Sequence, residues 1–207
     1  READPATGRR LLERSLALKF EDLYPGESVS ASRTFFQEED YTRYGKLTMF
    51  VHGGNPASPT YETNFPALED TVGGLASPIE LFLRFTSISG DTLNFYEYRS
   101  GVYQGWAPEA NTVEVDLELV SQLKGQFLDL KAAGQASTDS LNLSLKGGEY
   151  TARYDKDRNT IEIGSGGRSY IVRGNPALSR IRAFTVGINP GEVAGQTVAH
   201  AHIHIIP

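Results

Sequence analysis

The chain of 207 residues has no cysteine and only one tryptophan and one methionine. Without cysteine it forms neither a disulfide nor a thiolate metal site. No run approaches the roughly 18 to 20 apolar residues of a membrane-spanning helix, and no segment resembles a signal peptide. Positive charge is also scarce, because 20 basic residues stand against 26 acidic ones and give a net charge of −6. A nucleic-acid binder needs a positive face, so the charge argues against that class, although it leaves room for a small nucleotide pocket.

Glycine and the aromatic residues tyrosine and phenylalanine are plentiful. The 21 glycines, ten tyrosines and ten phenylalanines favour many short strands and turns. A hydrophobic content of 39% is enough for a sizeable core. We therefore predict a mainly β chain, an antiparallel β-sandwich or jelly-roll-like fold with at most one or two short helices. Residues 1–15 are charged and contain Pro5 and Gly8, which predicts a linker or tail.

Alternation of apolar and polar residues predicts the individual strands. We expect strands over residues 16–20, 29–36, 46–52, 79–85, 92–99, 113–117, 141–145, 150–154, 169–172 and 184–188. Residues 79–99 and 141–154 read as two hairpins, because turn residues separate their strands. A short helix is expected over residues 119–130, and a long surface loop over residues 53–70.

Three of the four histidines, His200, His202 and His204, occupy alternate positions near the end of the chain. Alternate residues of an extended strand point to the same face, so the three imidazoles would form one row. Such a row can be a metal site, a nucleophile with orienting partners, or a polar edge strand without chemistry. The metal site is the weakest of these, because three ligands on one strand rarely complete a tetrahedral shell.

The segment around these histidines, with Asn189 and Gln196 upstream, resembles the signature of the histidine triad (HIT) nucleotide hydrolases and transferases. The resemblance covers residues 184–207. It implies that His202 attacks the α-phosphorus of a nucleotide, that His200 orients it and that His204 contacts the phosphate. It also implies a phosphate-binding role for Asn189, Gln196 and Thr197.

The rest of the HIT active site has no counterpart in the chain. The family carries an upstream nucleoside pocket with a Gly-His-x-Leu-Val-like strand, and the surroundings of the only other histidine, His52, do not match it. We therefore expect the chain as it stands to be no enzyme and to hold no cofactor or metal. The sites at His200, His202 and His204 are conditional on the HIT interpretation.

Residues 9–190 resemble a second family, the large SprA-type cell-surface proteins of gliding bacteria, which form the outer-membrane channel of the type IX secretion system. The matching runs are residues 16–20, 23–26, 33–36, 40–53, 83–85, 94–99 and 174–181. The resemblance divides the chain into a SprA-like β domain over residues 16–190 and a terminal strand pair over 184–207. A chimeric junction is expected near residues 190–193, where the two signatures meet.

The SprA resemblance spans most of the chain, so it decides the expected function. We predict a non-enzymatic module of a cell-surface or outer-membrane protein that contacts neighbouring domains, with no nucleic acid and no membrane span of its own. Its location would be the cell surface, outer membrane or periplasm. A HIT-type hydrolase or transferase using His202, with a nucleotide substrate and a cytoplasmic location, is the alternative.

Overall fold

The computed structural model describes residues 16–23, 27–54, 79–88, 90–165, 167–190 and 198–206. The predicted tail over residues 1–15 lies outside the described residues, as does nearly all of the predicted loop over residues 53–70. Gln196, Thr197 and the expected junction near residues 190–193, apart from its first residue, lie outside them too.

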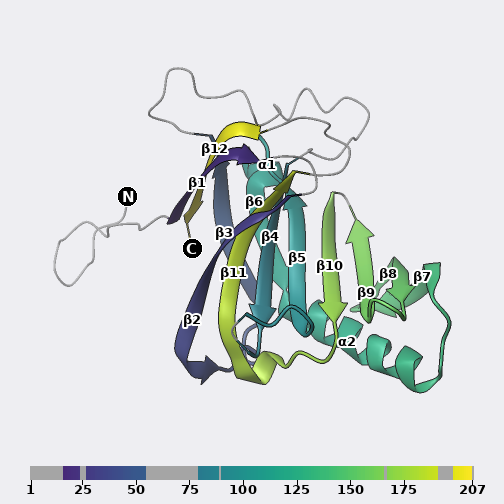
Figure 1. The fold of residues 1–207 in the computed structure, drawn as a ribbon. Helices are drawn as coiled ribbons and strands as arrows, with labels where there is room; N and C mark the ends of the chain where they lie inside the picture. The colour runs from purple at the N-terminus through teal and green to yellow at the C-terminus, as the bar shows by residue number, and fades with distance from the viewer. Residues whose placement is uncertain are drawn as a thin grey trace.

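The larger of two sheets is antiparallel and has eight strands (Figure 1). Its order is β2-β11-β4-β5-β10-β9-β8-β7. The strands are β2 (Val29–Glu39), β4 (Ile79–Thr86), β5 (Phe95–Gly101), β7 (Thr138–Leu145), β8 (Gly148–Asp155), β9 (Thr160–Ser165), β10 (Arg168–Arg173) and β11 (Ile181–Pro190). β7 and β8 are joined by a two-residue turn at Lys146 and Gly147, whose φ angles are positive, 48° and 76°. The 3-10 helix η2 (Leu178–Arg180) leads from β10 to β11.

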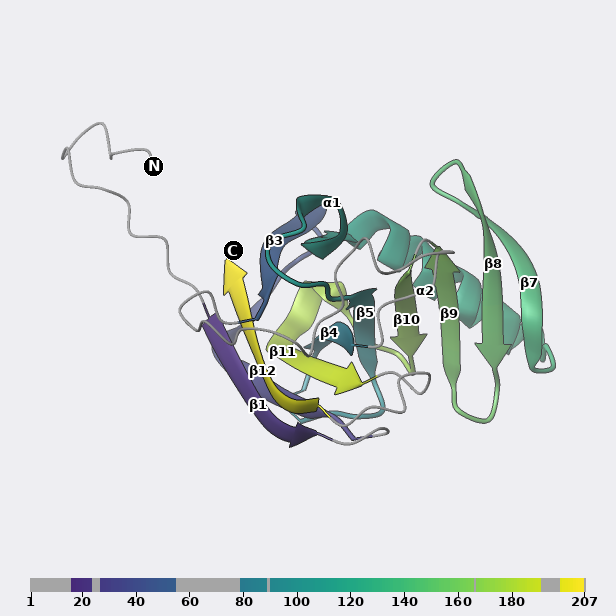
Figure 2. The same cartoon turned by 90° about the horizontal axis from the view of Figure 1, so that it is seen from above.

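A second, four-stranded sheet has the order β1-β12-β3-β6. Its strands are β1 (Leu16–Leu23), β12 (Val198–Ile206), β3 (Lys46–Gly53) and β6 (Thr112–Asp116). Seen from above, β1 and β12 lie at the opposite end of the molecule from β7 and β8 (Figure 2). The two ends of the described chain thus pair with each other, Leu16 opposite Ile205 and Leu23 opposite Val198.

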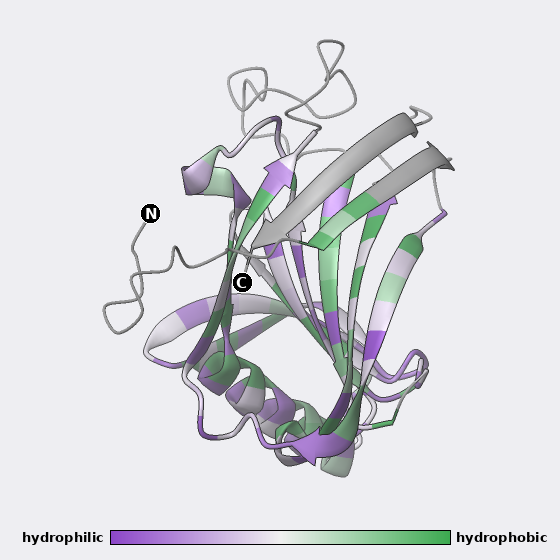
Figure 3. Ribbon diagram, turned by 90° about the vertical axis from the view of Figure 1, so that its left-hand side faces the viewer, coloured by the Kyte–Doolittle hydropathy of each residue, from purple (hydrophilic) through white to green (hydrophobic). Residues whose placement is uncertain are grey.

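The core lies on one face of the large sheet. Alternate residues of β4 and β5, among them Leu81, Leu83 and Tyr98, are fully buried there. They pack against β3 and β6 and against the helix α2 (Leu117–Ala132), which covers β7, β9 and β10. Figure 3 shows apolar and polar segments alternating along the strands, as a two-layer packing requires.

The helix α2 has a defined start and an apolar stripe. The Asp116 side chain accepts a hydrogen bond from the Leu119 backbone N–H (3.0 Å) and so caps the helix. Leu119, Leu123 and Phe127 are buried at the spacing of helical turns. The single turn of helix α1 (Pro108–Asn111) precedes β6.

The predicted fold class is confirmed, because the described chain is mainly antiparallel β and sandwich-like, with one long helix and one short one. Each of the predicted strands is present, and both hairpins pair as expected. The helix is longer than the predicted residues 119–130 and begins two residues earlier, at Leu117, because Asp116 caps it there. Gly125 does not interrupt the helix. Its position is exposed, so the missing side chain removes nothing from the core.

Candidate functional site

The histidine segment forms the regular strand β12, between β1 and β3. Its backbone register places His200 opposite Glu21, His202 opposite Lys19 and His204 opposite Ala17 of β1. The Cα positions therefore follow the extended spacing that the sequence predicts. The side chains of β12 lie outside the described residues.

The same register brings the fourth histidine to this strand. On the other side of β12, His204 is the partner of His52 in β3. The two residues are more than 150 positions apart, so no spacing in the sequence indicates that they meet. Only the pairing of the last strand with β3 could have shown it.

His52 is buried, with 4% of its surface exposed. Its Nδ1 donates a hydrogen bond to the Gly54 carbonyl oxygen (3.2 Å), and because a carbonyl only accepts, this contact places the proton on Nδ1. The Trp106 ring meets the imidazole edge to face, with 4.7 Å between the ring centres. These contacts give His52 a structural environment, in which its ring is part of the packing beneath the loop that carries Trp106.

The loop that holds Trp106 is fixed by backbone bonds and by one buried amide. Gly53 and Gly105 exchange backbone hydrogen bonds of 3.0 and 2.8 Å. The Asn111 amide accepts from the Tyr103 N–H and donates to the Tyr103 and Gly105 carbonyl oxygens, at 2.8 to 3.0 Å. The position of Trp106 over His52 is therefore determined by the chain on both sides of it.

The predicted phosphate-binding residue Asn189 lies on a different sheet from β12. It is near the end of β11, opposite Glu80 of β4. In the described residues β12 pairs with β1 and β3, and β11 pairs with β2 and β4. The structure thus places Asn189 and the three histidines on two different sheets, and the catalytic and phosphate-binding roles stay predictions.

A cluster of charged side chains on the outer face of the large sheet was not anticipated from the sequence. The Glu97 carboxylate is almost fully buried and bonded by two guanidinium groups, with Arg84 Nη2 at 2.6 Å from Oε2 and Arg99 Nε at 2.7 Å from Oε1. The Arg84 guanidinium also lies over the rings of Phe95 (4.1 Å) and Phe82 (5.5 Å). Two guanidinium groups therefore bind one carboxylate, and two aromatic rings pack against one of these guanidinium groups.

Glu80 lies on the same face of β4, four residues before Arg84. Burial raises the pKa of the Glu80 carboxyl above its usual value, and the carboxylates of Glu162 and Glu97 act in the same direction, while Arg99 opposes them. The signal for this cluster was present in the hairpin, because residues 84, 97 and 99 occupy the polar positions of two alternating strands. The burial of Glu97 was not visible in that alternation.

The charged cluster is suited to holding strands together rather than to acid–base chemistry. Glu97 accepts from both arginines, so its charge is matched by strong, charge-assisted hydrogen bonds. Among the residues that the structure describes, no three His, Cys, Asp or Glu side chains gather as a metal site would require. No helix within the described ranges is long and apolar enough to cross a membrane.

A small apolar cavity opens where the β2–β3 connection meets the core. Its volume is about 140 Å³. The lining residues are Tyr41, Tyr44, Lys46, Leu47, Phe85 and Leu117. Burial raises the pKa of the Tyr41 phenol, with Glu39 and Tyr44 contributing in the same direction, so this hydroxyl stays protonated at neutral pH.

No protein-family model and no curated protein sequence matches this chain.

Proposed function

We propose that the chain is a non-enzymatic β-sandwich module of a SprA-like cell-surface or outer-membrane protein that takes part in secretion and gliding motility. It contacts neighbouring domains of that protein through the edges and outer faces of its sheets. It needs no cofactor and acts at the cell surface, in the outer membrane or in the periplasm. The sequence resemblance over residues 9–190 is the source of this proposal.

The observation that supports this proposal is a contrast within the large sheet. Its inner face is covered, whereas its edge strand β2 is exposed. The inner face of the large sheet is occupied by β3, β6 and α2. The edge strand β2 is instead exposed at ten of its eleven positions. A rigid sheet with one long accessible edge is suited to contact with a neighbouring domain.

The charged cluster around Glu97 supports the same proposal. It joins β4 and β5 by the Arg84–Glu97 pair and lies on the face that α2 does not cover. Ion pairs of this kind fix the arrangement of strands without requiring a ligand. The sheet therefore keeps its shape while its edge is free to engage a partner.

The proposal is tested in cells that carry the gene of the full-length protein. An epitope tag in that protein should be accessible to protease on intact cells, and a His202→Ala exchange should leave secretion and gliding unchanged. A tag that is protected until the cells are lysed would contradict the surface location. Loss of secretion in His202→Ala, at unchanged protein level, would contradict the non-enzymatic role.

The second candidate function is a HIT-type nucleotide hydrolase or transferase with His202 as nucleophile. It is favoured by the regular strand β12, whose backbone carries His200, His202 and His204 at alternate positions. Such an enzyme would form a covalent nucleotidyl adduct on His202 when given a dinucleoside polyphosphate. Intact-mass measurement of the folded chain, with His202→Ala as the control, tests this. The absence of an adduct on the parent chain would remove the candidate.

A further inference from the structure

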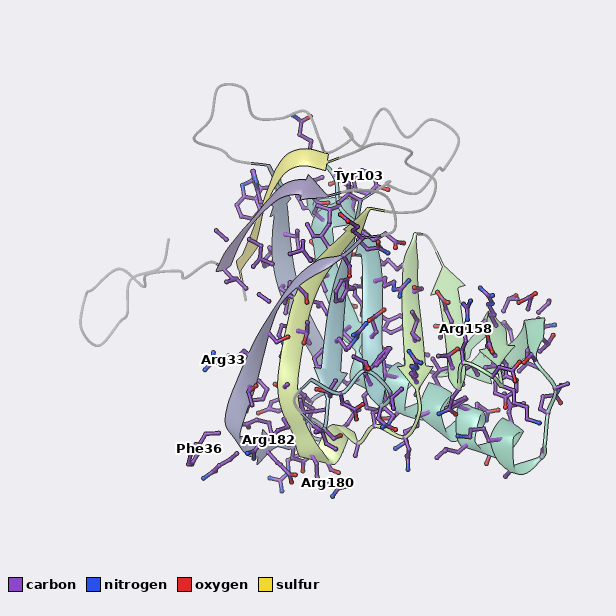
Figure 4. The ribbon with its side chains drawn as sticks, viewed as in Figure 1. Arg33, Phe36, Tyr103, Arg158, Arg180 and Arg182 are labelled. Carbon is purple, nitrogen blue, oxygen red and sulfur yellow. The ribbon has the colours of Figure 1, made fainter. Side chains whose placement is uncertain are left out.

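An aromatic side chain near the end of β2 is exposed to solvent. Phe36 is 92% exposed, the highest value of any large hydrophobic side chain among the described residues. The side chain points away from the sheet in Figure 4. A benzyl group held in water at the edge of a rigid sheet is a candidate anchor for a protein contact.

The pairing of β2 is irregular around Phe36. The pairing of β2 with β11 shifts between Thr34, opposite Ala183, and Glu39, opposite Ile181. Over this stretch β2 takes five residue steps where β11 takes two, so the extra residues leave the ladder. Bulges at a sheet edge redirect side chains and discourage the addition of another strand. The edge is therefore adapted to contact through a side chain rather than through backbone pairing.

The same end of the molecule has a cavity whose volume is suited to an aromatic ring. The cavity beside Tyr41 and Tyr44 measures about 140 Å³, close to the volume of about 150 Å³ at which an apolar cavity accepts a benzene ring. The Tyr41 ring meets the rings of Tyr44 and Phe85 edge to face, each at 6.1 Å. Tyr44 is 61% exposed, so the cavity is accessible from solvent. A fourth aromatic ring is the group that such walls favour.

Phe36 and the cavity lie close together along the chain. Tyr41 follows Phe36 by five residues, and its backbone N–H donates to the Leu178 carbonyl oxygen (2.8 Å), which fixes the cavity wall beside η2. A two-fold dimer requires that complementary features lie on the same patch, because each copy presents both. Phe36, Tyr41 and Tyr44 fall within nine residues at the end of β2, so the exposed ring and the cavity lie at the same end of the large sheet.

The charges around Phe36 are mixed, in contrast to the acidic balance of the whole chain. The charged side chains of the end of β2, the cavity wall and the segment around η2 comprise five cations and three carboxylates, namely Arg33, Arg43, Lys46, Arg180, Arg182, Glu38, Glu39 and Asp40. The chain as a whole carries −6. Two copies that approach through this end therefore bring together a surface with both signs, which pairs with itself more readily than the acidic remainder would.

We propose that two copies of the chain form a symmetric dimer in which Phe36 of each copy occupies the Tyr41–Tyr44–Phe85 cavity of the other. This interface goes beyond the proposed function and does not depend on it, because a surface module and an enzyme could both dimerise in this way. The second copy is the chosen occupant because the chain itself carries the exposed ring, the ring-sized cavity and the mixed charges at one end of the large sheet.

Sedimentation velocity over a wide concentration range tests the dimer. The parent chain should shift from monomer to dimer as its concentration rises, and Phe36→Ala should weaken this association strongly. Loss of an aromatic anchor costs roughly 30-fold or more in affinity, and a symmetric dimer loses two anchors, so we expect about a thousandfold. Leu128→Ala is the matched control, because it removes an exposed apolar side chain of α2 and should leave the association unchanged.

Variants of the cavity make the test specific. Leu47→Phe fills the cavity and should abolish the dimer. Tyr44→Ala removes an exposed part of the cavity wall and should weaken the dimer. This second variant provides the test if Leu47→Phe does not fold. A mixture of Phe36→Ala with a folded cavity variant should form a heterodimer, because one complete ring-in-cavity contact remains. A parent chain that is monomeric at every concentration would overturn the proposal. So would a dimer that Phe36→Ala leaves intact, or a mixture that gives no heterodimer when each variant is folded by circular dichroism.

Discussion

Two strands of the same sheet, β2 and β4, differ in how they are held. β4 is buried at six of its eight positions, and both neighbouring strands pair with it over nearly its whole length. β2 is exposed at all but one position and pairs with β11 alone in the large sheet. The same extended backbone is therefore the centre of the core in one case and an accessible edge in the other.

The difference lies in what covers the two faces of each strand. The inner residues of β4 pack on β3, β6 and α2, whereas its outer residues Phe82 and Arg84 join the cluster around Glu97. Gly187 of β11 contributes to this outer packing, because a side chain at this position would collide with the Phe82 ring, whose nearest atom would be 2.2 Å from the added carbon. Among the residues that the structure describes, no comparable layer of buried residues covers β2. Changes in β4 and β5 should therefore act on stability, and changes in β2 on contacts.

The largest effect is expected in the core face of β4. Leu83 is fully buried, and Leu83→Ala should lower the free energy of unfolding by about 2 to 5 kcal/mol, since it leaves a cavity in a packed layer. The matched change in β2, Val29→Ala, removes methyl groups that are 37% exposed and should cost less than about 1 kcal/mol. Urea unfolding followed by circular dichroism measures both. Equal losses would show that the edge strand is as firmly packed as the centre.

A smaller loss is expected on the outer face. Glu97→Gln keeps the shape of the side chain but leaves Arg84 and Arg99 without their buried counter-charge. The loss should be roughly 1 to 3 kcal/mol, below the value for a fully buried pair because both arginines reach solvent. On β2, Ser32→Ala removes an exposed hydrogen bond to Thr185 and should change stability by less than about 0.5 kcal/mol. A neutral Glu97→Gln would mean that the cluster does not stabilise the sheet.

The strands could be predicted because their alternation is local. Met49 and Val51 are buried as the pattern of residues 46–52 requires, and residues 79–99 form the hairpin that their turn residues indicate. The burial of the other face was not predictable from alternation, because polar residues at alternate positions usually face water. Arg84 and Glu97 are polar and yet part of a packed layer, since each satisfies the charge of the other.

Of the candidate site, the sequence predicts only the strand that carries the three histidines. The spacing of His200, His202 and His204 predicts an extended segment, and β12 is a strand. Its neighbours were beyond sequence reasoning, because the pairing of β12 with β1 and β3 joins segments separated by most of the chain. For the same reason the meeting of His204 with His52, and the separation of Asn189 from this strand, could be seen only in the fold.

The smallest expected effect depends on pH and sharpens the contrast between β4 and β2. Burial raises the pKa of Glu80 in the folded state above its ordinary value of 4.5, with Glu162 and Glu97 adding to the shift and Arg99 opposing it. The folded state thus favours the protonated carboxyl, and the contribution of Glu80 is most favourable below the unfolded pKa and is lost as the pH rises through the folded pKa. Glu80→Gln cannot ionise and avoids this loss.

The two proteins should therefore differ little in stability near pH 4, and the variant should be the more stable one near pH 7, by less than about 1 kcal/mol because solvent screens a half-buried group. Urea unfolding at both pH values measures the difference. Glu38→Gln is the control, because it makes the same exchange at an exposed position of β2, away from the buried layer on β4. A Glu80→Gln variant that loses stability on going from low to neutral pH relative to the parent would show that Arg99 outweighs burial at this position, and that the outer face of β4 is more strongly bound by ion pairs than its burial indicates.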